Sequence, residues 1–235
     1  MEAVFEQEIL VHDDMVSLVD RTVKQTIPLD VFFDTISKNK PMLTPVLPYN
    51  CRLMATNPKD KKSLFIMERT PKATPVSFCD RSNKIKNFVI SLPFIQFYVM
   101  FSTAGENPGF LGCWLSCTKK PIMSDDDPIY VLPLPNQFDN GDSGVCTGHI
   151  RVATATIPVM CNELIAGYFG SPFNNDLNME YPSIFGTNSH EKAFEKWDEL
   201  TKKNPLLAIS KDITYRESRF GTLKAKCAQL LKSGE

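Results

Sequence analysis

The sequence predicts an α+β protein built on an antiparallel meander sheet with flanking helices. Short apolar or alternating runs, separated by turn-forming residues, continue as far as residue 117 and are typical of strands. Amphipathic runs with helical spacing occupy the last third of the chain. The strands follow one another directly instead of alternating with helices, and this order favours an antiparallel sheet.

The individual elements can be assigned in chain order. Residues 3–11 and 15–23 predict a β-hairpin that turns at His12-Asp13-Asp14, and residues 31–38 predict a short helix. Further strands are expected at 51–57, at 62–70, on both sides of Pro93 within Phe88–Phe101, and at Phe110–Cys117. Helices are expected at Val159–Tyr168, at Glu191–Lys202 with Ser189 as N-cap, and at Thr222–Leu231.

We expect a single domain spanning residues 1–235. Within it, residues 1–45 form the N-terminal hairpin extension and short helix, residues 46–173 the core, and residues 174–235 a helical region. The composition, 43% hydrophobic and 23% charged, is that of an ordinary folded protein. A net charge of −1 provides no overall field to attract nucleic acid or an anionic membrane.

The chain is expected to be cytoplasmic. The first ten residues, MEAVFEQEIL, are acidic and alternating, unlike a signal peptide. The longest apolar run, Phe88–Phe101, contains Pro93 and is too short to cross a membrane. Seven cysteines at irregular spacing favour buried free thiols in a reducing compartment. Cys113 and Cys117 resemble half of a metal site, but no second pair follows at a suitable spacing, so no metal is expected.

Several familiar motifs are incomplete in this sequence. Gly141-Asp142-Ser143-Gly144 resembles the surroundings of a protease serine, but the one preceding histidine, His12, lies in a hairpin turn. Asp125-Asp126-Asp127 could bind a hard cation, although a solvated loop explains it better. No phosphate-binding loop or dinucleotide fingerprint occurs, and no cofactor is expected.

Cys146 has more distinctive surroundings than the other cysteines. It lies between Gly144-Val145 and Thr147-Gly148, after the Pro135-Asn136 pair. Thioester chemistry needs an accessible thiol near a donor that can stabilise an oxyanion, and the amide of Asn136 is such a donor. The alternative, that Cys146 is a small buried apolar residue, stays open on sequence alone because reactivity depends on exposure and pKa.

These residues resemble the ubiquitin-conjugating superfamily, in which a His-Pro-Asn tripeptide precedes the active-site cysteine by a short loop. The closer likeness is to PRTRC system protein B, the prokaryotic ubiquitin-conjugating-like family D. The matching segments are Leu134-Pro135-Asn136, Ser143-Gly144-Val145-Cys146-Thr147-Gly148 and Tyr168-Phe169-Gly170-Ser171-Pro172-Phe173. The sequence departs from the superfamily at Leu134, where the histidine is missing, and in a loop about two residues longer than usual.

The resemblance implies a ubiquitin-conjugating-like fold and a transferase encoded by a bacterial or mobile genetic element. Its partners would be a ubiquitin-like protein, a ThiF-like activating enzyme and a JAB-type peptidase. Cys146 would carry the modifier as a thioester, and Asn136 would stabilise the oxyanion. His149 is expected to tune the thiol, and Asp142 or Asp139 to orient the incoming lysine. Two alternatives remain open: a catalytically inactive binding module of the same fold, and a structural protein of a plasmid or phage assembly.

Overall fold

The computed structural model describes residues 47–57, 59–104, 107–138, 144–148, 150, 156–175 and 185–232, with the backbone of three strands before residue 29. The chain divides into two compact units, Met1–Val46 and Leu47–Glu235. The first unit contains an antiparallel sheet of strands β1 (Glu8–His12), β2 (Met15–Asp20) and β3 (Thr22–Pro28). The predicted hairpin is therefore present, with His12 opposite Met15. Strand β3 was not predicted, and the helix predicted at 31–38 lies outside the described residues.

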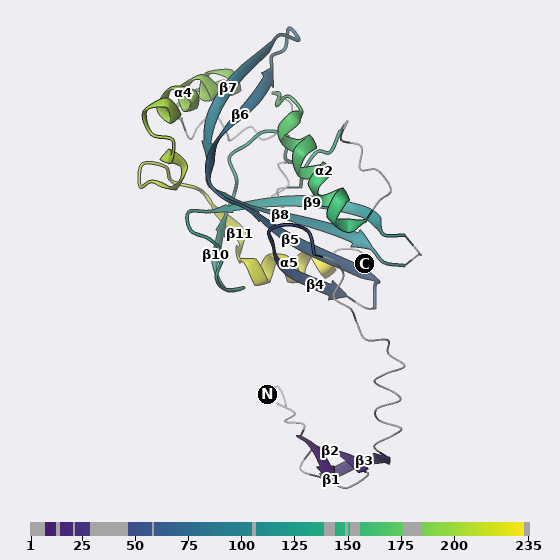
Figure 1. Ribbon diagram of the computed structural model, residues 1–235. Coiled ribbons are helices and arrows are strands. Elements are labelled where there is room, and N and C mark those ends of the chain that lie inside the picture. The colour runs from purple at the N-terminus through teal and green to yellow at the C-terminus, as the bar shows by residue number, and fades with distance from the viewer. Residues whose placement is uncertain are drawn as a thin grey trace. The chain divides into compact units, whose positions relative to one another are not determined.

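The second unit is built on a six-stranded antiparallel sheet in the order β11-β10-β9-β8-β5-β4 (Figure 1). Its strands are β4 (Cys51–Asn57), β5 (Lys62–Arg69), β8 (Phe94–Ser102), β9 (Gly109–Thr118), β10 (Pro128–Tyr130) and β11 (Glu217–Thr222). Strands β4, β5, β8 and β9 pair in this order as antiparallel neighbours, and they form the predicted meander. The α+β class is confirmed.

A second hairpin interrupts this meander. Strands β6 (Lys72–Cys79) and β7 (Ile85–Leu92) pair with each other and project from the sheet (Figure 1). Strand β7 is separated from β8 by Pro93 alone, so the long apolar run bends at that proline as predicted.

Three helices complete the described part of the second unit: α2 (Ile157–Gly170), α4 (His190–Lys203) and α5 (Leu223–Lys232), with a short 3-10 helix at Leu207–Ile209. All three match predicted helices to within a few residues. Ser189 is the N-cap of α4, and its hydroxyl accepts the Lys192 N–H at 3.2 Å. None of the described helices is both long and apolar enough to cross a membrane.

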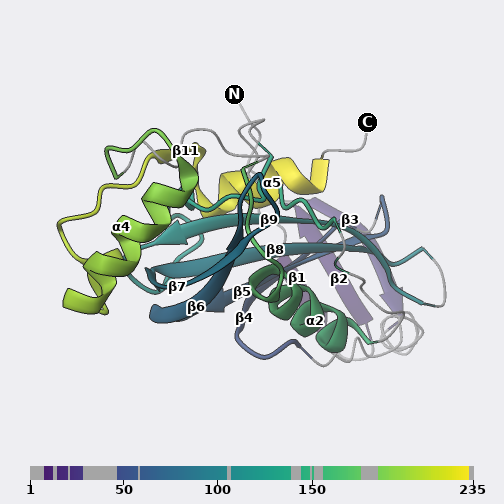
Figure 2. The ribbon, with the colours of Figure 1, turned by 90° about the horizontal axis from the view of Figure 1, so that it is seen from above.

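The central strands are covered on both faces, which explains their uninterrupted apolar sequence. Alternate residues of a strand point to opposite faces of a sheet. Phe97 and Val99 of β8 pack in the core that includes α2, whereas Tyr98 and Met100 pack in the smaller core that includes α5. The sheet accordingly lies between these two helices (Figure 2).

Helix α4 packs against β7 and bonds to its backbone. The Val89 N–H donates to Asp198 Oδ1 at 2.8 Å, and the Ser91 N–H donates to Thr201 Oγ1 at 2.8 Å. These side chains occupy hydrogen-bonding positions that a neighbouring strand would otherwise fill.

Lys226 of α5 is buried against the sheet, with 1% of its surface exposed. Its ammonium donates to the Leu115 carbonyl and lies 4.5 Å from the centre of the Tyr98 ring. Removal from water disfavours the charged form, and burial lowers the pKa of Lys226 to about 7.

We predict that this lysine makes stability depend on pH. The unfolded chain keeps the amine protonated up to its ordinary pKa of 10.5, whereas the folded chain releases the proton near its folded pKa of about 7. Between these values the unfolded state binds more protons, so the free energy of unfolding rises with pH, by at most about 1.4 kcal/mol per pH unit.

Urea unfolding measures this at about pH 7 and at about pH 9. From the lower to the higher pH, the free energy of unfolding of wild type should increase relative to that of Lys226→Met. Lys224→Met, at an exposed position of the same helix, should follow wild type. Equal pH dependence of wild type and Lys226→Met would contradict the prediction.

Candidate functional site

The Pro135-Asn136 segment is anchored by buried side chains. Leu134 is fully buried and extends into the larger core. Gln137 is 2% exposed, and its amide Nε2 donates to the carbonyls of Leu132 and Leu134, at 3.1 and 2.8 Å. The hydroxyl of Tyr168, near the end of α2, donates to the Pro135 carbonyl at 3.1 Å. The turn is thus fixed to both the core and α2.

Asn136 has a left-handed backbone conformation, with φ of +61°. Asparagine adopts this conformation more readily than most residues, so its presence here has a local structural reason. Its side-chain Nδ2 donates to the Pro172 carbonyl at 3.4 Å, a long hydrogen bond. The side chain therefore reaches toward the segment that follows α2.

Residues 144–146 pair like a short strand with β9 on one side and with the Pro-Asn turn on the other, and this pairing places Cys146 next to Asn136. Gly144 forms a bridge with Trp114 of β9, and the Val145 N–H donates to the Cys113 carbonyl at 2.8 Å. On its other side the Cys146 N–H donates to the Asn136 carbonyl at 2.9 Å. The backbone thus places the predicted cysteine and the predicted asparagine directly side by side.

The thiol of Cys146 differs from the other thiols in its surroundings. Val145 is buried in the core, and the alternation of an extended chain directs Cys146 to the opposite side, where it is half-buried. Cys51 and Cys79 are also half-buried, but their thiols donate to the carbonyls of Leu53 and Asp80. Within the described residues, the Cys146 thiol has no such acceptor.

The remaining cysteines are enclosed in the two cores. Burial raises the pKa of Cys161 to about 12 and that of Cys227 to about 11, and raises the pKa of Cys113 and Cys117 still further. The thiolate is the nucleophilic form, so these four cysteines are poor nucleophiles. The prediction that most cysteines are buried thiols agrees with this arrangement.

An aromatic surface borders the loop that carries Cys146. A side chain at Gly112 would place its Cβ 2.7 Å from the indole of Trp114, so glycine is needed for the ring to lie over β9. A Cβ at Gly144 would lie 3.5 Å from both Trp114 and Phe138. Trp114 is half-buried and Phe138 is 46% exposed. Sequence reasoning missed these residues, as it missed the anchoring roles of Gln137 and Tyr168.

Asp142, His149 and Asp139 lie outside the described residues. In the part of the chain that is described, no group of three or more His, Cys, Asp and Glu side chains is arranged to hold a metal ion. What the structure brings together is a half-buried thiol, a backbone bond from its residue to Asn136, and an aromatic border. A thiol of this kind can accept an acyl group.

Comparison with known proteins found no match for this chain among family models, curated proteins or solved structures.

We predict that native-state alkylation will separate the cysteines by burial. N-ethylmaleimide should modify Cys146 and Cys79 within minutes, whereas Cys113, Cys117 and Cys161 should react only after unfolding. Peptide mass spectrometry after timed quenching measures each rate. A Cys146 that reacts as slowly as Cys113 would show that its thiol is not accessible.

Proposed function

We propose that this chain carries a ubiquitin-like modifier as a thioester on Cys146, as a ubiquitin-conjugating-like transferase does. The observation that carries this proposal is the 2.9 Å hydrogen bond from the Cys146 N–H to the Asn136 carbonyl. It joins the Pro-Asn and Gly-Val-Cys segments, which are separated by a loop in the sequence. These are two of the three segments on which the resemblance to family D rests.

The order of the elements supports the same proposal. An antiparallel meander leads to the Pro-Asn turn, then to the cysteine, and then to helix α2. This order is the one that the resemblance leads us to expect of a ubiquitin-conjugating-like fold. The rigid anchoring of the turn by Gln137 and Tyr168 would keep the amide of Asn136 near the reacting centre.

The chemistry requires two acyl transfers. In the first, the Cys146 thiolate attacks the thioester carbonyl of the loaded activating enzyme, and the activating enzyme's thiolate leaves. In the second, a substrate amine attacks the new thioester, an amide forms, and the Cys146 thiolate leaves while the amine loses a proton. Each step passes through an oxyanion, and in the transfer to the amine the Asn136 amide would stabilise it.

A binding module without catalysis is the second candidate. It is favoured by Leu134 in place of the expected histidine and by the bond from Asn136 Nδ2 to Pro172, which engages the amide elsewhere. Such a module would bind the same ubiquitin-like protein but would not carry it covalently. The two candidates differ in whether an adduct forms on Cys146.

We predict a thiol-sensitive adduct when the chain is mixed with ATP and with the ubiquitin-like protein and ThiF-like activating enzyme of its own gene cluster. Gel electrophoresis without reductant should show the adduct for wild type, and reductant should remove it. Cys146→Ala should form none, and Cys146→Ser should form at most an ester that resists reductant. Cys79→Ser, which replaces another half-buried thiol, should load like wild type. An adduct on Cys146→Ala equal to wild type would exclude Cys146 as the carrier.

We further predict that Asn136 acts in transfer more than in loading. Asn136→Gly removes the amide but fits the backbone φ of +61° without strain. The variant should acquire the modifier at nearly the wild-type level but discharge it to free lysine about a hundredfold more slowly, the usual effect of losing one oxyanion donor. Single-turnover discharge measures this rate, and a melting temperature close to wild type shows that the fold is intact. Unchanged discharge would assign Asn136 a structural role only.

A further inference from the structure

A cavity of about 660 Å³ lies beside the loop between β9 and β10, and the proposed thioester chemistry does not use it. Its volume falls in the range of pockets that enclose small organic ligands. The apolar part of its wall is formed by Pro121, Ile122, Met123, Pro128, Tyr130 and Tyr215. Met123 is 84% exposed and forms the outer rim of the cavity.

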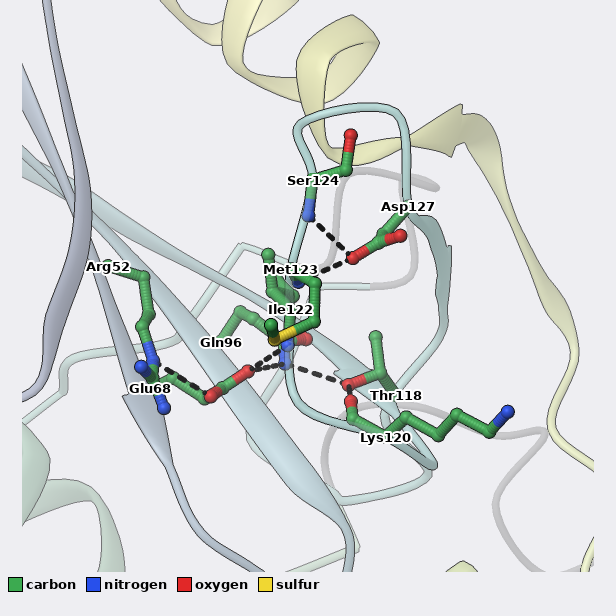
Figure 3. Close-up of polar contacts among 9 residues, drawn as sticks. All are labelled: Arg52, Glu68, Gln96, Thr118, Lys120, Ile122, Met123, Ser124 and Asp127. Atoms are coloured by element: carbon green, nitrogen blue, oxygen red, sulfur yellow. Dashed lines mark hydrogen bonds and ion pairs between the residues drawn. The ribbon is translucent and has the colours of Figure 1, made fainter.

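A buried carboxylate holds one wall of this cavity in place (Figure 3). The side chain of Glu68 is completely buried, and its Oε2 accepts the Ile122 N–H at 2.9 Å. Its Oε1 accepts from Arg52 Nε at 3.0 Å, and the amide of Gln96 donates to its Oε2 at 3.3 Å. Burying a carboxylate is costly unless several donors compensate it, so this loop is fixed by a fully bonded group.

Two further contacts fix the rest of the loop. The Thr118 hydroxyl donates to the Lys120 carbonyl at 2.6 Å. Asp127 Oδ2 accepts the N–H groups of Met123 and Ser124, at 2.6 and 2.9 Å (Figure 3). These two bonds lower the pKa of Asp127, and they hold the turn closed. The cavity wall is therefore preformed, which reduces the entropy lost when a ligand binds.

The charged side chains that line the cavity, Lys119, Lys120 and Asp127, carry a net positive charge. The ammonium of Lys119 donates to the carbonyls of Ser210 and Ile213, and no carboxylate neutralises it among the described residues. An ammonium has three N–H donors, so one remains for a ligand. Lys120 is exposed, and its amine has no partner in the described part of the chain. Asp127 is the one acidic residue of the lining, and its Oδ2 is already engaged by its own turn.

We propose that this cavity binds a small organic anion with a flat apolar body. The body would lie between the tyrosine and proline side chains, and the anionic group would meet the ammonium groups of Lys119 and Lys120. Tyr215 is suited to form a rigid wall because its hydroxyl donates to the Ala208 carbonyl at 2.7 Å. This site is independent of the proposed function, since it shares no residue with the thiol site.

The test uses 2-naphthoate and its uncharged analogue 2-naphthamide with the full chain. Titrations followed by ¹H–¹⁵N NMR should show saturable shifts for 2-naphthoate, confined to the lining of the cavity. Affinity for 2-naphthamide should be about tenfold lower, because the charge-assisted bond is missing. Thr214→Trp, which fills the cavity with an indole, should abolish binding of both compounds. Thr103→Trp, at an exposed position away from the cavity, should bind like wild type.

Lysine variants test the role of charge. Lys119→Gln and Lys120→Gln should each bring the affinity for 2-naphthoate closer to that for 2-naphthamide. Lys72→Gln, which removes an exposed lysine elsewhere, should leave the preference unchanged. If Lys119→Gln fails to fold, Lys120→Gln and Thr214→Trp still decide the matter. The proposal is overturned if 2-naphthoate does not saturate, if Thr214→Trp binds it normally, or if both compounds bind equally to wild type.

Discussion

Strands β5 and β8 have to bury side chains on both faces, and the arrangement of the second unit follows from this requirement. A central strand of an antiparallel sheet commonly has one solvent-exposed face, whereas both faces of these two strands are buried. Each large apolar side chain removed from water contributes about 1.5–3 kcal/mol to stability. The chain must therefore provide two covers, and it does so with α2 on one face and α5 on the other.

The face of the sheet that α5 covers also buries polar side chains. Where the apolar cluster under α5 ends, the same face of the sheet continues with Glu68, Gln96 and Ser116, all buried. The Ser116 hydroxyl donates its one hydrogen to Gln96 Oε1 at 3.0 Å. The Tyr98 hydroxyl lies 2.8 Å from Ser116 Oγ and therefore has to be the donor in that pair. A fully bonded network of this kind links four neighbouring strands, from Arg52 of β4 to β9, and extends to the loop after β9.

Much of the fold could be predicted because apolar periodicity reports burial directly. The helices and the meander strands were recovered on that basis, as was the bend at Pro93. Strand β6 was missed because it contains Pro75, which argues against a strand unless its backbone nitrogen lies on an unpaired side. Strands β10 and β11 were missed because the first has three residues and the second is mostly polar.

The candidate site was predictable only in its residue types. Cys146 and Asn136 were identified from local sequence and resemblance, but their adjacency depends on hydrogen bonds that pair residues 144–146 with both β9 and the Pro-Asn turn. Such pairing joins segments distant in sequence, and no local pattern encodes it. Gln137 has no sequence signal of its own, since a glutamine in a loop is usually solvated, whereas this one is buried and bonded.

Both strands of the β6–β7 hairpin have outer backbone groups that are hydrogen-bonded by other segments of the chain. Phe173 pairs with β6, where its carbonyl accepts the Cys79 N–H at 2.7 Å, and α4 caps the N–H groups of Val89 and Ser91 on β7. An uncovered strand edge can recruit the same strand of another molecule and start aggregation. Losing Asp198 or Thr201 would therefore leave an N–H of β7 unbonded on a strand whose apolar Ile85 and Val89 are exposed, so these two positions of α4 protect the chain against association through this edge.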